Sequence, residues 1–61
     1  MKINGKHYDY KSQSITELLK ELNLNPNKVV VELNGDIIDL NDDPMVETES
    51  ELEIVQFVGG G

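Results

Sequence analysis

Three consecutive glycines, Gly59, Gly60 and Gly61, stand at the end of the chain, directly after the apolar pair Phe57-Val58. A glycine segment has no side chains, so it can enter a channel too narrow for other residues and bring its backbone close to a ligand. If Gly61 ends the native chain, the group it offers for chemistry is its own backbone carboxylate. A frayed terminus without a function is the alternative, because chain ends are often poorly ordered.

Composition removes several other kinds of chemistry. The chain has no cysteine, which excludes disulfides, thiolate zinc sites and a cysteine nucleophile, so any sulfur must be supplied from outside. The single histidine, His7, leaves metal binding without an evident ligand set. The aspartates of the middle segment lack the full spacing of a calcium loop and predict solvated turns: Asp36, Asp39, Asp42 and Asp43.

The charge of the chain is strongly acidic, with twelve acidic residues, five basic ones and a formal net charge of −7. Nucleic-acid binding depends on Lys and Arg, so this class is disfavoured. An acidic surface can speed docking on a basic partner, or it can simply keep a small protein in solution. No apolar run reaches the ~18–20 residues that span a bilayer, and residues 1–4 do not begin a signal peptide. We therefore expect a cytoplasmic protein that binds no membrane.

The segment from Ser14 onward predicts a helix. Residues 14–17, Ser-Ile-Thr-Glu, match a capping box, in which Ser14 accepts from the Glu17 amide and the glutamate reaches back. Four apolar residues follow with the spacing of one helical face: Ile15, Leu18, Leu19 and Leu22. The helix should end near Leu22, because Pro26 disfavours helical geometry at the residue before it.

Two Asn-Gly pairs, at residues 4–5 and 34–35, indicate tight turns, because both residue types tolerate a positive φ. The first follows a strand at residues 2–3 and precedes an alternating segment at residues 7–10. The second follows a strand at residues 28–33 and precedes a short apolar run. Residues 41–44 predict a turn, and Met45-Val46 predicts a short strand or an isolated turn.

The strand at residues 28–33 has Val29, Val31 and Leu33 on one face, with Val30 and Glu32 on the other. These alternations predict one apolar face for the helix to cover.

The last strand, residues 51–58, has Leu52 and Ile54 on one face and Glu53, Val55 and Phe57 on the other. The first and last strands should lie side by side at the centre of the sheet. The expected fold is an α+β β-grasp, a mixed sheet with one helix across one face. Residues 1–58 form the domain, and residues 59–61 form a glycine tail.

A β-grasp of about this length ending Val58-Gly59-Gly60-Gly61 resembles the ThiS-type sulfur carriers of thiamine thiazole synthesis, a ubiquitin-like family. The resemblance covers essentially the whole chain. It rests on the Ile3-Asn4-Gly5 hairpin, the apolar helix face, residues 29–35, and residues 53–58 before the glycines. Molybdopterin-type carriers and ubiquitin-like modifiers share this architecture, but are usually longer.

The resemblance implies a carrier that is the substrate of an enzyme rather than an enzyme itself. In such carriers a ThiF-type adenylyltransferase uses ATP and magnesium to adenylate the terminal glycine carboxylate, here that of Gly61. Sulfur from a donor such as a cysteine desulfurase persulfide then replaces AMP and leaves a thiocarboxylate. Thiazole synthase takes the sulfur from it. This chain itself is expected to bind no cofactor and no metal.

Elementary chemistry is compatible with this role. An α-carboxyl group has a pKa of about 3.3–3.7, so it is an anion at neutral pH and resists nucleophilic attack. Converting it to an acyl phosphate anhydride supplies a good leaving group. The cations and donors for this step must come from the activating enzyme, because the sequence places none near Gly61.

Val55, Phe57 and Val58 are the candidate partner interface. The alternation places Val55 and Phe57 opposite the core pair of the last strand, and apolar groups clustered on an exposed face often mark a partner site. A covering loop, or scattered surface hydrophobes, is the alternative. Gly59 and Gly60 are expected to form a flexible tether in the free protein.

Three further functions stay open on the sequence. A molybdopterin-type carrier would use the same terminal chemistry with a different acceptor. A ubiquitin-like modifier would be joined through Gly61 to lysine amines. A purely structural interaction module would keep its partner affinity after the glycines were trimmed.

Overall fold

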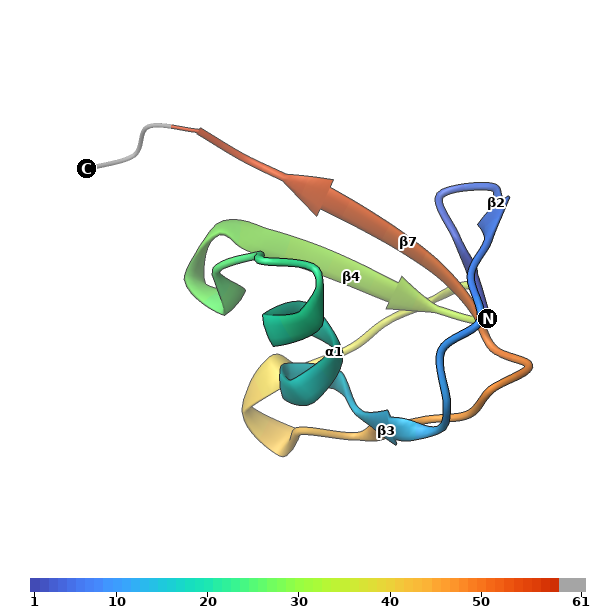
Figure 1. The fold of residues 1–61 in the computed structure, drawn as a ribbon. Helices are drawn as coiled ribbons and strands as arrows, with labels where there is room; N and C mark the ends of the chain where they lie inside the picture. The colour runs from blue at the N-terminus through green and yellow to red at the C-terminus, as the bar shows by residue number, and fades with distance from the viewer. Residues whose placement is uncertain (59–61) are drawn as a thin grey trace.

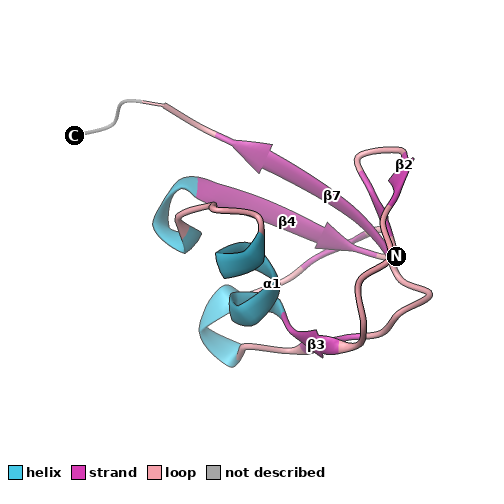
Figure 2. Ribbon diagram, in the orientation of Figure 1, coloured by secondary structure: helices cyan, strands magenta, loops and turns pink. Residues whose placement is uncertain are grey.

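The computed structural model of the protein describes residues 1–58, and Gly59, Gly60 and Gly61 lie outside the described residues. A mixed β-sheet is crossed on one face by an α-helix (Figures 1 and 2). In chain order the elements are β1 (Lys2–Ile3), β2 (Lys6–His7), β3 (Gln13–Ser14), α1 (Ile15–Glu21), the 3-10 turn η1 (Pro26–Lys28), β4 (Val29–Leu33), β5 (Asp36–Ile37), the 3-10 turn η2 (Leu40–Asp42), β6 (Met45–Val46) and β7 (Glu51–Gln56). None of the helices in residues 1–58 has the length and apolar character needed to cross a membrane.

The main sheet has the strand order β2-β1-β7-β4-β5. The first and last strands lie side by side and run parallel, with Ile3 opposite Leu52. β7 pairs with β4 in antiparallel fashion, and hairpins add β2 and β5 at the two edges. The predicted β-grasp arrangement, including the central pairing of the first and last strands, is confirmed.

A second sheet of two short strands was only half predicted. Of the two structures expected at Met45-Val46, a short strand or an isolated turn, the strand β6 is present, and it pairs with β3, which was not predicted. β3 consists of two polar, half-buried residues, Gln13 and Ser14, so no apolar alternation marks it.

The alternating segment at residues 7–10 also differs from expectation. The strand β2 ends at His7, and Tyr8 and Tyr10 continue in a loop with their rings stacked, their centroids 5.7 Å apart. The backbone pairing with the start of the chain still reaches Tyr8, because the Tyr8 N–H donates to the Met1 carbonyl at 2.7 Å and the Met1 amino group donates to the Tyr8 carbonyl at 3.0 Å.

The core lies between α1 and the inner face of the main sheet. The helix contributes Ile15, Leu18 and Leu19, all almost fully buried, whereas Leu22 is only partly buried. The sheet contributes four residues of the predicted inward faces, Val29, Val31, Leu52 and Ile54, together with Ile3, while the predicted Leu33 is only partly buried. Burying each such aliphatic side chain contributes about 1.5–3 kcal/mol, and a chain this short has few of them.

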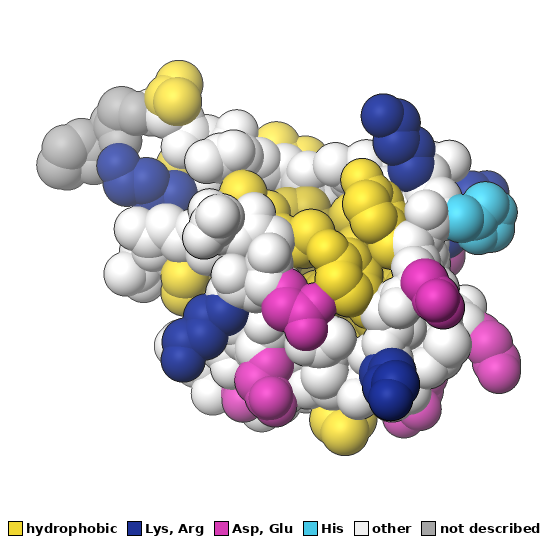
Figure 3. Space-filling view, in the orientation of Figure 1, with side chains coloured by type: hydrophobic (Ala, Val, Ile, Leu, Met, Phe, Trp, Pro, Cys, Tyr) yellow, Lys and Arg dark blue, Asp and Glu magenta, His cyan; other side chains and the backbone are white. Residues whose placement is uncertain are grey.

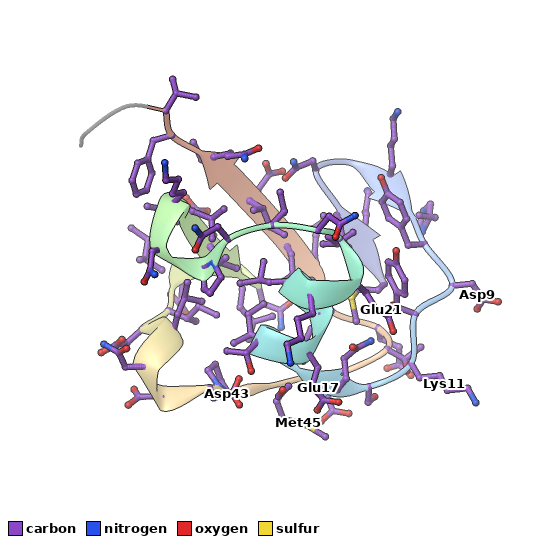
Figure 4. All side chains as sticks on the ribbon, turned by 60° about the vertical axis from the view of Figure 1, so that its left-hand side comes forward. Asp9, Lys11, Glu17, Glu21, Asp43 and Met45 are labelled. Carbon is purple, nitrogen blue, oxygen red and sulfur yellow. The ribbon has the colours of Figure 1, made fainter. Side chains whose placement is uncertain are left out.

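The first turn of α1 is held by two acceptors. The Ser14 hydroxyl accepts from the Glu17 N–H at 3.3 Å, as predicted, but it also donates to the Glu17 carboxylate at 3.2 Å. The glutamate therefore reaches back to the hydroxyl of the serine. Asp43, which lies beside this turn (Figure 4), accepts from the Thr16 N–H at 3.0 Å and from the Thr16 hydroxyl at 2.8 Å.

Asp43 was predicted only as part of a solvated turn. Its backbone is left-handed, with φ of 45°, at the end of η2, and this aims the carboxylate at α1. The hydrogen bonds from the Thr16 N–H and hydroxyl lower the pKa of Asp43 below its ordinary value of 3.8. The carboxylate thus links the η2 turn to the start of the helix.

Replacing Asp43 by Asn should lower the melting temperature by a few degrees at neutral pH, because the charge that caps α1 is lost while the left-handed backbone is kept. Since the pKa is lowered by folding, this stabilisation is present above the unfolded pKa and is lost as the pH falls through the folded pKa. Thermal unfolding followed by circular dichroism at several pH values measures it. Asp42→Asn is the control, because the Asp42 side chain bonds to no described residue. Equal melting temperatures for Asp43→Asn and wild type at neutral pH would contradict this role.

Candidate functional site

β7 is the strand that leads to the glycines. It runs through the middle of the sheet and ends at the far side from β2 (Figure 1). On the β4 side it is paired along its whole length, from Leu52 opposite Leu33 to Gln56 opposite Val29. One further bond, from the Phe57 N–H to the Lys28 carbonyl at 2.9 Å, extends this pairing beyond the strand. The chain is therefore fixed almost up to Val58, the last described residue.

Both Asn-Gly turns also bind β7 through their asparagine side chains. Asn4 and Asn34 have positive φ, 52° and 50°, as the predicted turns require. The Asn4 Oδ1 accepts from the Ile54 N–H at 2.7 Å, and its Nδ2 donates to the Ile54 carbonyl at 3.1 Å. The Asn34 Oδ1 accepts from the Glu51 N–H at 2.9 Å. The two turns were predicted from the sequence, but the bonds from the asparagine side chains to β7 were not. The only sign of these bonds in the sequence is that both turns use Asn before Gly.

Two of the predicted interface residues, Val55 and Phe57, are exposed on the face of the sheet that the helix does not cover, and Val58 is exposed beyond the end of β7. Val55 is 61% exposed, Phe57 45% and Val58 92%. Val30, at 43%, lies directly opposite Val55 on β4. The sequence placed Val30 on this face but did not count it in the interface. We call these four residues, Val30, Val55, Phe57 and Val58, the terminal patch.

Two carboxylates lie next to the terminal patch. Glu32 and Glu53 are directly opposite each other on β4 and β7, one row along from Val30 and Val55. Both are exposed, and like charges directly opposite on a sheet are destabilising. Within residues 1–58 the single ion pair joins Lys2 to Glu51 at 4.0 Å, so neither carboxylate of this pair has a cation. The sheet face thus offers an apolar patch beside an unneutralised pair of acids.

The other candidates from the sequence do not form a site. His7 is exposed, as expected for a residue at a hairpin edge. The four aspartates of the middle segment are all exposed, as predicted, although Asp39 accepts from the Asn41 N–H at 2.9 Å and Asp43 caps α1. Within the described part of the chain, no group of three or more His, Cys, Asp or Glu residues is placed to hold a metal ion.

The predicted acceptor, Gly61, and the predicted tether, Gly59 and Gly60, lie outside the described residues. Their roles stay predictions. What the structure describes is the strand before them, which is hydrogen-bonded on the β4 side up to Phe57 and on the β1 side up to Ile54.

Replacing Asn4 by Gly should destabilise the fold by about 1–3 kcal/mol, because glycine keeps the positive φ but leaves the part-buried Ile54 N–H and carbonyl without partners. Urea unfolding gives the change in free energy. Asn34→Gly is the matched control, since it removes one bond to β7 instead of two. A larger loss for Asn34→Gly than for Asn4→Gly would contradict the assignment of Asn4 as the stronger of the two contacts.

Comparisons with known proteins agree with this architecture. The model of the ThiS family matches residues 1–61. A crystal structure of a thiamine biosynthesis protein (ThiS) from Geobacter metallireducens is similar at 32% identity and a TM-score of 0.76, covering 98% of this chain and 96% of that one. An NMR solution structure of a thiamine biosynthesis protein from the same organism is similar at 32% identity and a TM-score of 0.70, covering 98% and 85%. The comparison with curated proteins gave no match. The family match runs through the whole chain, glycines included, and the chain belongs to the ThiS family.

Proposed function

We propose that this protein is a sulfur carrier that holds sulfur as a thiocarboxylate at Gly61 and donates it to the thiazole ring of thiamine. The observation that carries the proposal is the ThiS family match over residues 1–61, which includes the glycines. The similar structures from Geobacter metallireducens, both named as thiamine biosynthesis proteins, favour the thiazole pathway over a molybdopterin one.

The proposed chemistry takes place on the carrier but is performed by another protein. A carboxylate oxygen of Gly61 attacks the α-phosphorus of ATP on a ThiF-type adenylyltransferase, a C–O–P bond forms, and pyrophosphate leaves. Magnesium and cationic groups of that enzyme stabilise the phosphate charge. A persulfide sulfur, from a donor such as a cysteine desulfurase, then attacks the acyl carbon and AMP leaves. A thiol cleaves the resulting S–S bond, forming a disulfide and leaving the thiocarboxylate for thiazole synthase.

The folded domain has an energetic task in this scheme. Three extended residues reach roughly 10 Å, enough for a carboxylate to enter a pocket while the domain stays outside. Fixing each of them costs about 1–2 kcal/mol of backbone entropy. Fully burying an exposed Val or Phe side chain contributes about 1.5–3 kcal/mol. Because three of the four side chains of the terminal patch are already partly buried, all four must be covered to offset the cost of holding the glycines in one conformation.

The charges suggest which kind of surface would cover the patch. The unpaired carboxylates of Glu32 and Glu53 lie one row from Val30 and Val55. A partner that brings a Lys or Arg to this row would relieve the repulsion between them. The net charge of −7 would also speed encounter with a basic enzyme. We propose that the adenylyltransferase presents an apolar surface edged by cations.

Incubation with a ThiF-type adenylyltransferase, ATP, magnesium and a sulfur donor should replace one oxygen of this protein by sulfur. Intact mass spectrometry measures the change, and fragmentation should place it on Gly61. A variant without Gly61 is the control and should gain nothing. Adducts linked through Gly61 to lysine amines would instead identify a protein modifier. Sulfur transfer only to a molybdopterin synthase subunit would identify the other carrier class.

Replacing Phe57 by Ala should raise the KM of the adenylation step for the carrier by about tenfold, because the terminal patch loses its aromatic side chain. Met45→Ala is the matched control. Met45 is a similarly exposed apolar residue, at 59%, and lies below α1 on the side away from the end of β7 (Figure 4). Its KM should stay within about twofold of wild type. Equal effects of the two substitutions would rule out the terminal patch as the docking surface.

A further inference from the structure

The two edges of β7 are used in different ways. The Phe57 N–H bonds the Lys28 carbonyl and the Asn34 N–H bonds the Glu51 carbonyl, so the odd-numbered residues of this segment direct their backbone groups toward β4. Bonds from the β1 side reach the even-numbered residues Ser50, Leu52 and Ile54. Because the direction alternates along a strand, the N–H and carbonyl of Gln56 also face the β1 side.

The β1 edge is closed up to Ile54 and open at Gln56. The Lys2 N–H bonds the Ser50 carbonyl at 2.9 Å, and the Asn4 N–H bonds the Leu52 carbonyl at 2.9 Å. The Asn4 side chain then occupies both backbone groups of Ile54. The chain turns away at this point, where Asn4 has a positive φ. Within residues 1–58 no hydrogen bond reaches the backbone of Gln56 from this side.

A hollow lies beside this open edge. It has a volume of about 230 Å³. Leu22 and Leu24, which follow α1, line one side of it, Tyr8 lines the opposite side, and Ile54 and Gln56 of β7 also contribute. Figure 3 shows hydrophobic side chains gathered on this surface between α1 and the β1–β2 hairpin. Tyr8 is 38% exposed, and its ring stacks on that of Tyr10. The hollow is wide enough for one apolar side chain.

We propose that an extended segment of the activating enzyme pairs with the free edge of β7 at Gln56 and places one apolar side chain in this hollow. The inference rests on the proposed function and adds the mode of recognition. Edge pairing supplies main-chain hydrogen bonds, and the pocket for an alternate side chain supplies selectivity. It is separate from Val30, Val55 and Phe57 of the terminal patch, which lie on the opposite face of the sheet.

Continuity with the glycines identifies this occupant. Gln56 is separated from Gly59 by Phe57 and Val58 alone, so a segment that pairs at Gln56 runs directly toward the residue to be activated. The Asn4 side chain already bonds the backbone N–H and carbonyl of Ile54, so a partner strand can first pair with β7 at Gln56. The free edge at Gln56 therefore sets the register in which the enzyme segment pairs with the end of the carrier.

Charge argues against a second copy of this chain at the same edge. Each copy carries a net charge of −7. None of the residues that line the hollow is charged, but two acids are their neighbours in the chain, Asp9 after Tyr8 and Glu21 before Leu22. Both acids are exposed (Figure 4). Two such surfaces repel each other. The segment that fits is one whose apolar residue is flanked by Lys or Arg.

The test is Gln56→Pro, which removes the outward N–H without touching the β4 pairing, since proline is tolerated where a strand N–H faces away from the sheet. The KM of adenylation for the carrier should rise by about tenfold. Gln56→Ala keeps the N–H and should raise the KM far less. Ile37→Pro is the matched proline control on the opposite edge. Its N–H also faces outward, because the Ile38 N–H is the one that bonds the Val31 carbonyl.

Amide exchange in the complex gives a readout that needs no variant. With the adenylyltransferase bound, exchange of the wild-type Gln56 N–H should slow at least about tenfold, and in the free carrier it should be fast. Unchanged exchange in the complex, or equal KM values for the two proline variants, overturns this inference alone. If the wild type is not adenylated at all, the proposed function fails and takes the inference with it. Protection of Gln56 in the carrier alone, with a dimer in sedimentation, would assign the edge to a second copy.

Discussion

The hydrogen bonding of β7 is the constraint on which the rest of the molecule depends. This strand joins the first segment of the chain to the middle one, because β1 pairs with it on one side and β4 on the other. Its inward residues, Leu52 and Ile54, are also core residues beneath α1. A change that loosens β7 therefore affects the sheet and the core together.

The two faces of the sheet show how stability and recognition are divided. The inner face is apolar and covered, as folding requires. The outer face keeps Val30, Val55 and Phe57 in water and sets Glu32 opposite Glu53, choices that a protein selected for stability alone would not make. Such local conflict is expected where a surface is shaped for a partner. The stability lost there is small compared with that of the buried aliphatic core.

Sequence reasoning recovered what periodicity and turn chemistry encode. The helix face, the alternation of β4 and β7, and the two Asn-Gly turns all follow local rules, and each was confirmed. The exposure of Val55 and Phe57 followed from the same alternation. The β-grasp could be predicted because each of these local preferences agrees with the same fold.

What the sequence could not reveal are contacts between polar side chains and distant backbone. Asn4 reaches Ile54 across fifty positions, and Asp43 reaches Thr16 across 27. Asn and Asp at these positions belong to no periodic pattern. Both residue types are common in turns, so the sequence gives no reason to expect a distant contact as well. The small sheet of β3 and β6 was incomplete for the same reason, because two-residue strands are too short to show alternation. The open edge at Gln56 depends on where β1 ends, which is a property of the folded topology.

The asparagine that binds Ile54, Asn4, is also a site at which the protein can deamidate with time. An Asn followed by Gly is the sequence in which the next backbone nitrogen most easily attacks the side-chain amide, releasing ammonia and leaving an aspartate or its isomer. At Asn4 the amide is held by two hydrogen bonds to Ile54, which restrains that attack while the domain is folded. The carboxylate formed at residue 4 could not donate a hydrogen bond to the Ile54 carbonyl. One of its negatively charged oxygens would instead lie against that carbonyl oxygen, and the two would repel each other. Deamidation of Asn4 would therefore weaken the attachment of β7, the strand that precedes the glycines.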